Sequence, residues 1–116
     1  MSSSSRPRRS VLYMPGSNPR ALAKGRELPA DALILDLEDA VAPDAKETGR
    51  ETIVAALAEK AAYGHRELIV RVNGLDMPWG HGDLVTMAKV GADAILLPKV
   101  ESVDMVRRAL TTLEAA

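Results

Sequence analysis

Residues 31–44 have the sequence DALILDLEDAVAPD, and this stretch decides the fold. A strand is predicted over residues 32–37, because its first four residues form the short apolar run that is typical of a strand buried in a parallel sheet. Asp36, Glu38 and Asp39 lie at its carboxyl end, where a buried strand has no structural need for acid. Ligands bind at the carboxyl ends of parallel strands in α/β proteins. This end of the strand is therefore predicted to carry the function.

The alternation of strand and helix occurs four times along the chain. Strands are predicted over residues 11–14, 32–37, 68–72 and 94–97, and helices over residues 19–28, 45–63, 83–90 and from 103 onward. Asn18 is the predicted N-cap of the first helix, and Asp44 with Glu47 has the spacing of a capping box before the second. Such alternation predicts an α/β protein with a parallel sheet covered by helices. The sheet is either open and doubly wound or half of an eight-stranded barrel.

The composition indicates one ordinary globular domain. The 116 residues carry a net charge of −1, which gives no support for a nucleic-acid partner, and no apolar run approaches a membrane span. The chain has no cysteine, which excludes disulfides and zinc–thiolate sites and agrees with a cytoplasmic location. Residues 1–9 are predicted to be a mobile basic arm, and residues 10–116 a partial barrel domain.

The predicted strands each have one apolar face and one face that becomes polar at its carboxyl end. In the fourth strand this pattern assigns Ile95 and Leu97 to the second face. In a barrel the second face points into the lumen, which would place around one mouth Tyr13, Asp36, Glu38, Arg71, Asn73, Lys99 and Glu101. These charges either pair with one another or form a site for an anionic substrate, a metal ion, or both. Because buried charges are costly to desolvate even when paired, several of them at one end of a sheet favour a ligand site.

The residue types at this rim suggest two kinds of ligand. Arg71 presents a planar fork that suits a carboxylate. Asp36, Glu38 and Asp39 suit Mg²⁺, either directly or through bound waters.

Four motifs in order resemble the amino-terminal half of the HpcH/HpaI aldolase and citrate lyase β-subunit family, and most of all its CoA ester lyases of the malyl-CoA and citramalyl-CoA type. The motifs are residues 12–17 (LYMPGS), 35–46 (LDLEDAVAPDAK), 70–76 (VRVNGLD) and 97–102 (LPKVES). The resemblance implies a (β/α)₈ TIM-type barrel, of which this chain would be the first four βα units. It also implies Mg²⁺-dependent cleavage of a 3-hydroxyacyl-CoA to acetyl-CoA and an oxoacid, by a protein that is a homo-oligomer at full length.

The resemblance assigns roles to the residues of the rim. Arg71 matches an arginine that contacts substrate oxygens, and Tyr13 lies where relatives have an aromatic substrate contact. Asp36 and Glu38 match acids beside the metal and its waters. Asp39 falls where the hydroxy-oxo-acid aldolase branch carries a histidine, which favours the CoA ester lyase branch.

The resemblance also implies where CoA and the metal ion bind. Lys24 matches a basic residue near the CoA phosphates. Some malyl-CoA lyases have an arginine at the position of Asn18, and here Arg20 is nearby. The direct Mg²⁺ ligands of the family follow strands five and six, so we expect them beyond Ala116, with Glu38 and Asp39 in the outer shell.

Two alternatives to a lyase remain open at this point. The chain is alternatively a non-catalytic half barrel that binds CoA or assembles with a partner. A weaker alternative is a small open-sheet domain of the receiver type, because such domains also have acids after one strand and a lysine after a later one.

Overall fold

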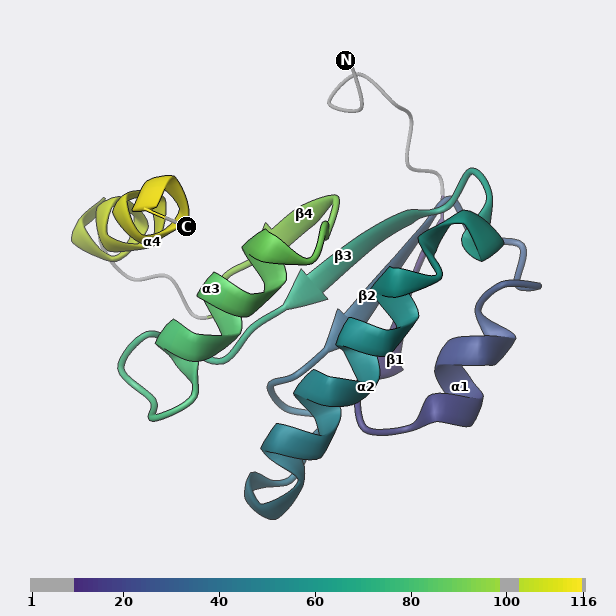
Figure 1. The fold of residues 1–116 in the computed structure, drawn as a ribbon, viewed down its shortest axis with the longest axis horizontal. Coiled ribbons are helices and arrows are strands. Elements are labelled where there is room, and N and C mark those ends of the chain that lie inside the picture. Colours follow the sequence, from purple (N-terminus) through teal and green to yellow (C-terminus); the bar gives the residue numbers. More distant parts are fainter. Residues whose placement is uncertain (1–9, 99–102, 116) are drawn as a thin grey trace.

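Four strand–helix units follow one another along the described part of the chain (Figure 1). The computed structural model describes residues 10–98 and 103–115. The strands are β1 (Val11–Pro15), β2 (Ala32–Asp36), β3 (Glu67–Arg71) and β4 (Ala94–Leu96), and the α-helices are α1 (Pro19–Lys24), α2 (Lys46–Ala58), α3 (Gly80–Lys89) and α4 (Val103–Ala115). Two 3₁₀ helices, η2 (Pro43–Ala45) and η3 (Lys60–Tyr63), precede and follow α2. None of the described helices is both long and apolar enough to cross a membrane.

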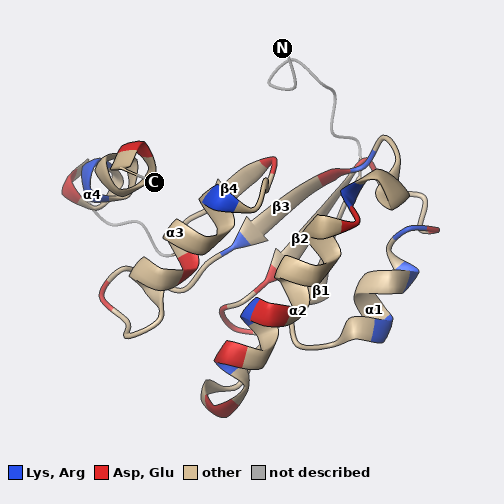
Figure 2. Ribbon diagram, in the orientation of Figure 1, with Lys and Arg blue, Asp and Glu red and all other residues tan. Residues whose placement is uncertain are grey.

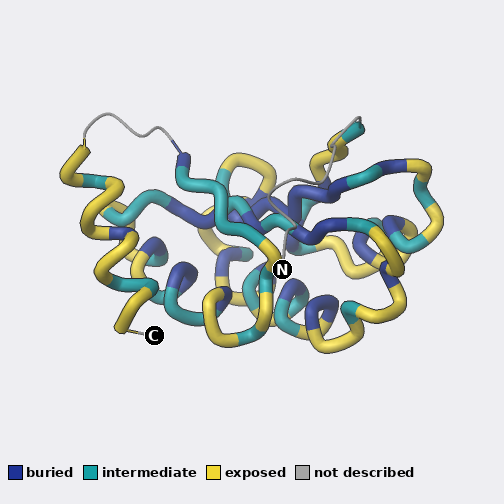
Figure 3. The backbone as a smooth tube through the Cα atoms, turned by 90° about the horizontal axis from the view of Figure 1, so that it is seen from above, coloured by how far each residue is buried: buried dark blue, intermediate teal, exposed yellow. Residues whose placement is uncertain are grey.

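The sheet has the strand order of a barrel segment. Its four strands lie in sequence order, β1-β2-β3-β4, and every neighbouring pair is parallel. The helices lie on one side of the sheet (Figure 3). A doubly wound sheet carries helices on both faces, whereas a barrel keeps them all outside. The prediction of an α/β fold is therefore confirmed, and the half barrel is favoured over the doubly wound sheet.

The hydrophobic core fills the space between the sheet and its helices. Leu33 and Leu35 of β2 are fully buried there, together with Leu68 and Val70 of β3. The strand register pairs Leu35 with Val70, so the two apolar rows lie side by side. Full burial of each such side chain contributes about 1.5–3 kcal/mol. This row anchors the sheet to the helices and leaves the opposite face to carry Tyr13, Asp36 and Arg71.

The predicted face assignment of the fourth strand is wrong. The register pairs Val70 with Ile95 and Arg71 with Leu96. Paired residues point to the same face of a sheet, so Ile95 packs against the core, as Leu97 also does. Residues 94–97 are all apolar and carry no alternation from which their faces could be predicted.

Several predictions fall outside the described residues. These are the basic arm at residues 1–9, the rim positions Lys99 and Glu101, and the capping role of Ser102 for the last helix.

The helix boundaries agree with the predictions only in part. Asn18 caps α1 as predicted, since its Oδ1 accepts a hydrogen bond from the amide of Ala21 at 3.0 Å, but α1 ends at Lys24 instead of residue 28. The predicted capping box is wrong: the N-cap of α2 is Ala45, and no side chain caps it. Asp44 lies inside η2, because Pro43 starts that 3₁₀ turn before the α-helix begins. The third helix begins three residues earlier than predicted, at Gly80.

Candidate functional site

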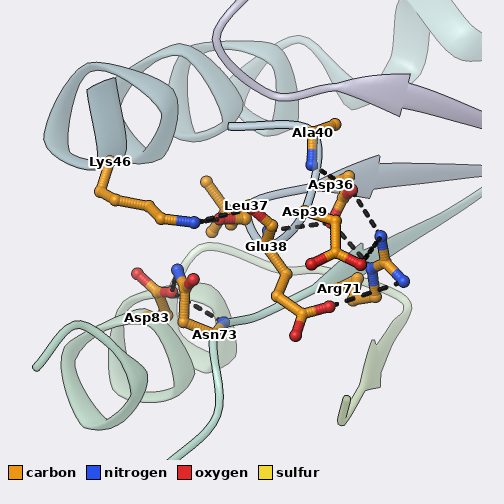
Figure 4. Close-up of polar contacts among 9 residues, drawn as sticks. All are labelled: Asp36, Leu37, Glu38, Asp39, Ala40, Lys46, Arg71, Asn73 and Asp83. Carbon is orange, nitrogen blue, oxygen red and sulfur yellow. Dashed lines mark hydrogen bonds and ion pairs between the residues drawn. The ribbon is translucent and has the colours of Figure 1, made fainter. Parts of the chain in front are cut away.

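The centre of the site is an ion pair between the ends of two neighbouring strands (Figure 4). Asp36 ends β2 and Arg71 ends β3, and the strand register places them side by side. Arg71 donates from Nε to Asp36 Oδ1 at 2.8 Å and from Nη2 to Oδ2 at 2.7 Å. This two-point geometry fixes the plane of the guanidinium as well as its position.

The carboxylate of Asp36 is saturated by hydrogen bonds. Besides the two from Arg71, it accepts one from the amide of Glu38 at 2.9 Å and one from the amide of Ala40 at 3.0 Å. Burial alone would raise the pKa of Asp36, which is 1% exposed, but Arg71 and the two amides outweigh burial and hold the pKa below its ordinary value. The same pair raises the pKa of Arg71. Asp36 therefore supports Arg71 and the β2–α2 loop and has no oxygen left for a direct metal bond.

Three further side chains surround Arg71. Glu38 Oε1 lies 3.6 Å from Nη1 of Arg71, and Asp39 Oδ2 lies 4.0 Å from Nη2. The ring of Tyr13 lies against the guanidinium, 5.0 Å from its carbon to the ring centroid. The structure thus brings together five residues that the sequence analysis placed at one end of the sheet. Tyr13 is 56% exposed, so its ring contacts the Arg71 guanidinium and also faces solvent.

A second buried cluster lies beside the first and was missed by the sequence analysis. Asp83 of α3 is 1% exposed and accepts hydrogen bonds from the amide of Asn73 at 3.0 Å, from Asn73 Nδ2 at 2.6 Å and from Arg50 Nε at 2.9 Å. Asn73 was predicted to share the face of Arg71. Instead it turns toward α3, because β3 ends at Arg71 and the alternation of the strand does not continue beyond it.

Lys46 joins the loop after β2 to the helix that follows it. Its ammonium donates to the carbonyl oxygens of Leu37 at 2.8 Å and Glu38 at 2.7 Å, and the residue is 7% exposed. Burial lowers the pKa of Lys46, while nearby carboxylates, Asp83 foremost, oppose that effect. The spacing of Lys46 and Arg50, four residues apart on one helix, is the signal from which both roles could have been suspected.

The loop after β1 packs closely against the site. The amide of Gly16 donates to the carbonyl oxygen of Asp36 at 2.8 Å. A Cβ on Gly16 would lie 2.7 Å from that same oxygen and 2.7 Å from Cδ1 of Ile53. Only glycine allows this approach, which brings the end of β1 and its Tyr13 next to the end of β2.

The residues assigned to CoA lie on α1, apart from the Arg71 cluster. Asn18 uses its side-chain oxygen to cap α1. Arg20 and Lys24 are exposed. Helix α1 packs beside α2 and β1, two strands away from Arg71, and the positions of its basic residues are blue on the ribbon in Figure 2. Their contact with CoA remains a prediction.

Two grooves in the described part lie away from the cluster. One of about 460 Å³ separates α1 from α2, and one of about 540 Å³ separates α3 from α4. Neither is lined by a residue of the Arg71 cluster, so the candidate site at the end of the sheet is separate from these outer grooves.

The described residues do not fit as direct Mg²⁺ ligands. Over residues 10–98 and 103–115, no three His, Cys, Asp or Glu side chains are placed to hold one metal ion. Both oxygens of Asp36 are already occupied. Glu38 and Asp39 lie 3.6 Å and 4.0 Å from the Arg71 guanidinium, and acids in such positions are suited to contacts with a metal ion through water.

A family model, HpcH/HpaI aldolase/citrate lyase, matches residues 9–116. The chain is 57% identical over 100 residues to a (3S)-malyl-CoA thioesterase of Cereibacter sphaeroides, which covers 86% of this chain and 35% of that protein. It is 44% identical over 97 residues to the citrate lyase β subunit of Escherichia coli, which covers 84% of this chain and 32% of that protein.

The structure resembles that of the protein CitE from Mycobacterium tuberculosis, crystallised with magnesium, acetoacetate and coenzyme A. The TM-score is 0.63 at 27% identity, over 85% of this chain and 35% of that chain. The four βα units match part of a TIM-barrel lyase. The chain spans about a third of the length of the curated relatives that it matches.

Proposed function

Because the chain belongs to the HpcH/HpaI aldolase/citrate lyase family, we propose that the whole protein acts on a 3-hydroxyacyl-CoA of the malyl-CoA or citramalyl-CoA type. The observation that carries the proposal is the guanidinium of Arg71, held in one plane by Asp36 at the carboxyl end of the sheet. Within the described residues, Nη1 of Arg71 and the second hydrogen of its Nη2 make only the longer ion-pair contacts, to Glu38 at 3.6 Å and to Asp39 at 4.0 Å. These donors are oriented to receive a carboxylate or a developing oxyanion.

The leading reaction is cleavage of a carbon–carbon bond. The 3-hydroxyl group loses its proton and becomes the carbonyl of an oxoacid, and the bond between C2 and C3 breaks. The electron pair of that bond passes to the thioester enolate, which takes up a proton to give acetyl-CoA. Arg71 would hold the oxoacid or the oxygen on which charge develops, while Asp36, Glu38 and Asp39 maintain its surroundings.

The second candidate is hydrolysis of the thioester. It is favoured by the identity of 57% to a protein named (3S)-malyl-CoA thioesterase. In this reaction water attacks the thioester carbonyl, the carbon–sulfur bond breaks, and the products are malate and free CoA. The same Arg71 would then hold the distal carboxylate of the malyl group, so one site serves both hypotheses.

Mg²⁺ is the proposed cofactor of the whole protein. Four carboxylates, those of Asp36, Glu38, Asp39 and Asp83, lie around the three cations Arg71, Lys46 and Arg50. The cluster therefore has a net negative charge, and an anionic oxoacid needs further positive charge to bind there. When bound, Mg²⁺ would supply a Lewis acid at the oxoacid oxygen. We place its direct ligands outside the described residues, with Glu38 and Asp39 acting through waters.

The proposed partners follow from the same reaction. They are the acyl-CoA, with Lys24, Arg20 and Asn18 near its CoA part, and a small oxoacid at Arg71. A homo-oligomer at full length and a cytoplasmic location are further parts of the proposal.

The test is a product analysis with (3S)-malyl-CoA on the protein at the length of its relatives. A lyase releases glyoxylate and acetyl-CoA without free thiol, whereas a thioesterase releases free thiol and malate. Arg71→Ala should lower kcat/KM by about 100-fold to 1,000-fold in either case, as for loss of one oxyanion donor. Arg107→Ala, on the exposed side of α4, is the matched control and should change little. Tight CoA binding without either product would instead favour the non-catalytic binding module.

A further inference from the structure

A buried lysine ties the acidic loop of the site to the next loop along the sheet. Lys46 begins α2, and its ammonium reaches back to the carbonyl oxygens of Leu37 and Glu38. The same ammonium lies 5.4 Å from the ring centroid of Trp79, the last residue before α3. One cation thus contacts both the β2–α2 loop and the β3–α3 loop.

A second contact from the same helix reinforces this link. Arg50 lies one turn after Lys46 on α2 and donates to the carbonyl oxygen of Trp79 at 3.1 Å. Arg50 is also paired with Asp83 at 2.8 Å, and the side chain of Asp83 is 1% exposed. Residues four apart lie on one face of a helix, so α2 presents two cations toward the contact between the β2–α2 loop and the β3–α3 loop.

Burial of an ammonium is costly unless protein groups replace its water contacts. Two carbonyl oxygens and an aromatic face do so for Lys46. These interactions stabilise the protein only while both loops stay in place. Because Glu38 supplies one of the two carbonyls and its carboxylate lies 3.6 Å from Arg71, the position of Lys46 and that of the acidic loop depend on each other.

We propose that Lys46 is a positioning residue that holds the β2–α2 loop against the β3–α3 loop and thereby sets Glu38 beside Arg71. This role rests on the proposed function in so far as Glu38 serves catalysis. Arg71 itself is held independently by Asp36, so loss of Lys46 should disturb Glu38 while leaving Arg71 in its ion pair.

The link can be measured without any assay of activity. Trp79 is the only tryptophan of the chain, so its quenching by acrylamide reports the β3–α3 loop alone. Hydrogen exchange at the amides of Glu38 and Ala40, which are bonded to Asp36, reports the β2–α2 loop. In Lys46→Met, we expect faster exchange at both amides and acrylamide quenching raised by about twofold, because both loops open more often. Lys89→Met, exposed at the end of α3, is the matched control and should leave both signals unchanged.

The activity arm separates the two proposals. In the protein at the length of its relatives, Lys46→Met should lower kcat by about 10-fold to 100-fold and leave KM for the acyl-CoA nearly unchanged, as for other outer-shell contacts. If the wild-type protein does not act on an acyl-CoA, the proposed function fails, while the exchange and quenching data still decide the role of Lys46.

Two results would overturn the role of Lys46. The first is unchanged exchange or unchanged quenching in Lys46→Met, since the lysine would then not join the two loops. The second is loss of the helical circular dichroism signal in both Lys46→Met and Lys46→Gln, of which the glutamine variant keeps a hydrogen-bond donor. Lys46 would then support the whole domain and not only the contact between the two loops.

Discussion

Replacing Asp36 by asparagine tests the ion pair on which the site depends. The substitution keeps the shape of the side chain but removes its charge. Four donors converge on the carboxylate, two from Arg71 and one each from the amides of Glu38 and Ala40. An asparagine offers one acceptor oxygen, and its NH₂ group would face donors on the other side. About half of these hydrogen bonds should therefore break.

The magnitude follows from the hydrogen bonds and the ion pair that the substitution removes. Hydrogen bonds to charged groups contribute about 1.5–3 kcal/mol each, and breaking a buried ion pair costs about 3–5 kcal/mol. The side chain of Arg71 is 21% exposed and has Glu38 as a remaining partner at 3.6 Å, which reduces the destabilisation. We expect Asp36→Asn to lower the free energy of unfolding by about 3 kcal/mol at neutral pH.

The effect should depend on pH in a defined direction. The pKa of Asp36 is lower in the folded state than its ordinary value. Its contribution is therefore fully present above the unfolded pKa of about 3.9 and is lost as the pH falls through the folded pKa. The difference between wild type and Asp36→Asn should shrink below about pH 4.

The assay is urea unfolding followed by far-ultraviolet circular dichroism over a series of pH values. Asp76→Asn, an exposed acid in the β3–α3 loop, is the control for loss of one negative charge. A destabilisation below about 1 kcal/mol at neutral pH, or one that persists undiminished at about pH 2, would refute the reasoning, because the carboxylate would then not be the acceptor of the four donors.

Three further substitutions test the surroundings of the site by the same unfolding assay. Gly16→Ala should destabilise by about 1–3 kcal/mol, because its Cβ would lie 2.7 Å from a backbone oxygen and from Ile53. A Gly16→Ala protein as stable as wild type would mean that the β1–α1 loop can move away from β2. Asp83→Ala should destabilise by about 3–5 kcal/mol, because Arg50 loses its buried partner. If neither Asp83→Ala nor Asp83→Asn lowered the free energy of unfolding by more than about 1 kcal/mol, the second cluster would be dispensable for stability. Asn18→Ala should destabilise by only about 1 kcal/mol, the usual effect of removing an N-cap, and a much larger effect would point to a contact beyond the cap.

The sequence predicted the strands well because their signals are local. The apolar run before Asp36 and the acids after it predicted both a buried strand and the end of the sheet at which the charged residues gather around Arg71. The alternation of β2 and β3 correctly placed Asp36 and Arg71 on one face. It failed in β4, where four apolar residues in a row carry no such signal.

The partners of each charge were decided by the tertiary structure. From the sequence, Asp36 is one of three equivalent acids that suit a metal ion. In the fold it is the acid that is saturated by Arg71 and two amides, because the parallel register sets it directly beside β3. The spacing of Lys46 and Arg50 indicates only that they share one face of a helix, and Asp83 carries no such signal. Their partners could not be predicted, because these contacts join residues 8 to 33 positions apart. Local patterns thus determined which elements form and where the polar ends lie, whereas only the packing of α2 and α3 against the sheet decided which charges meet.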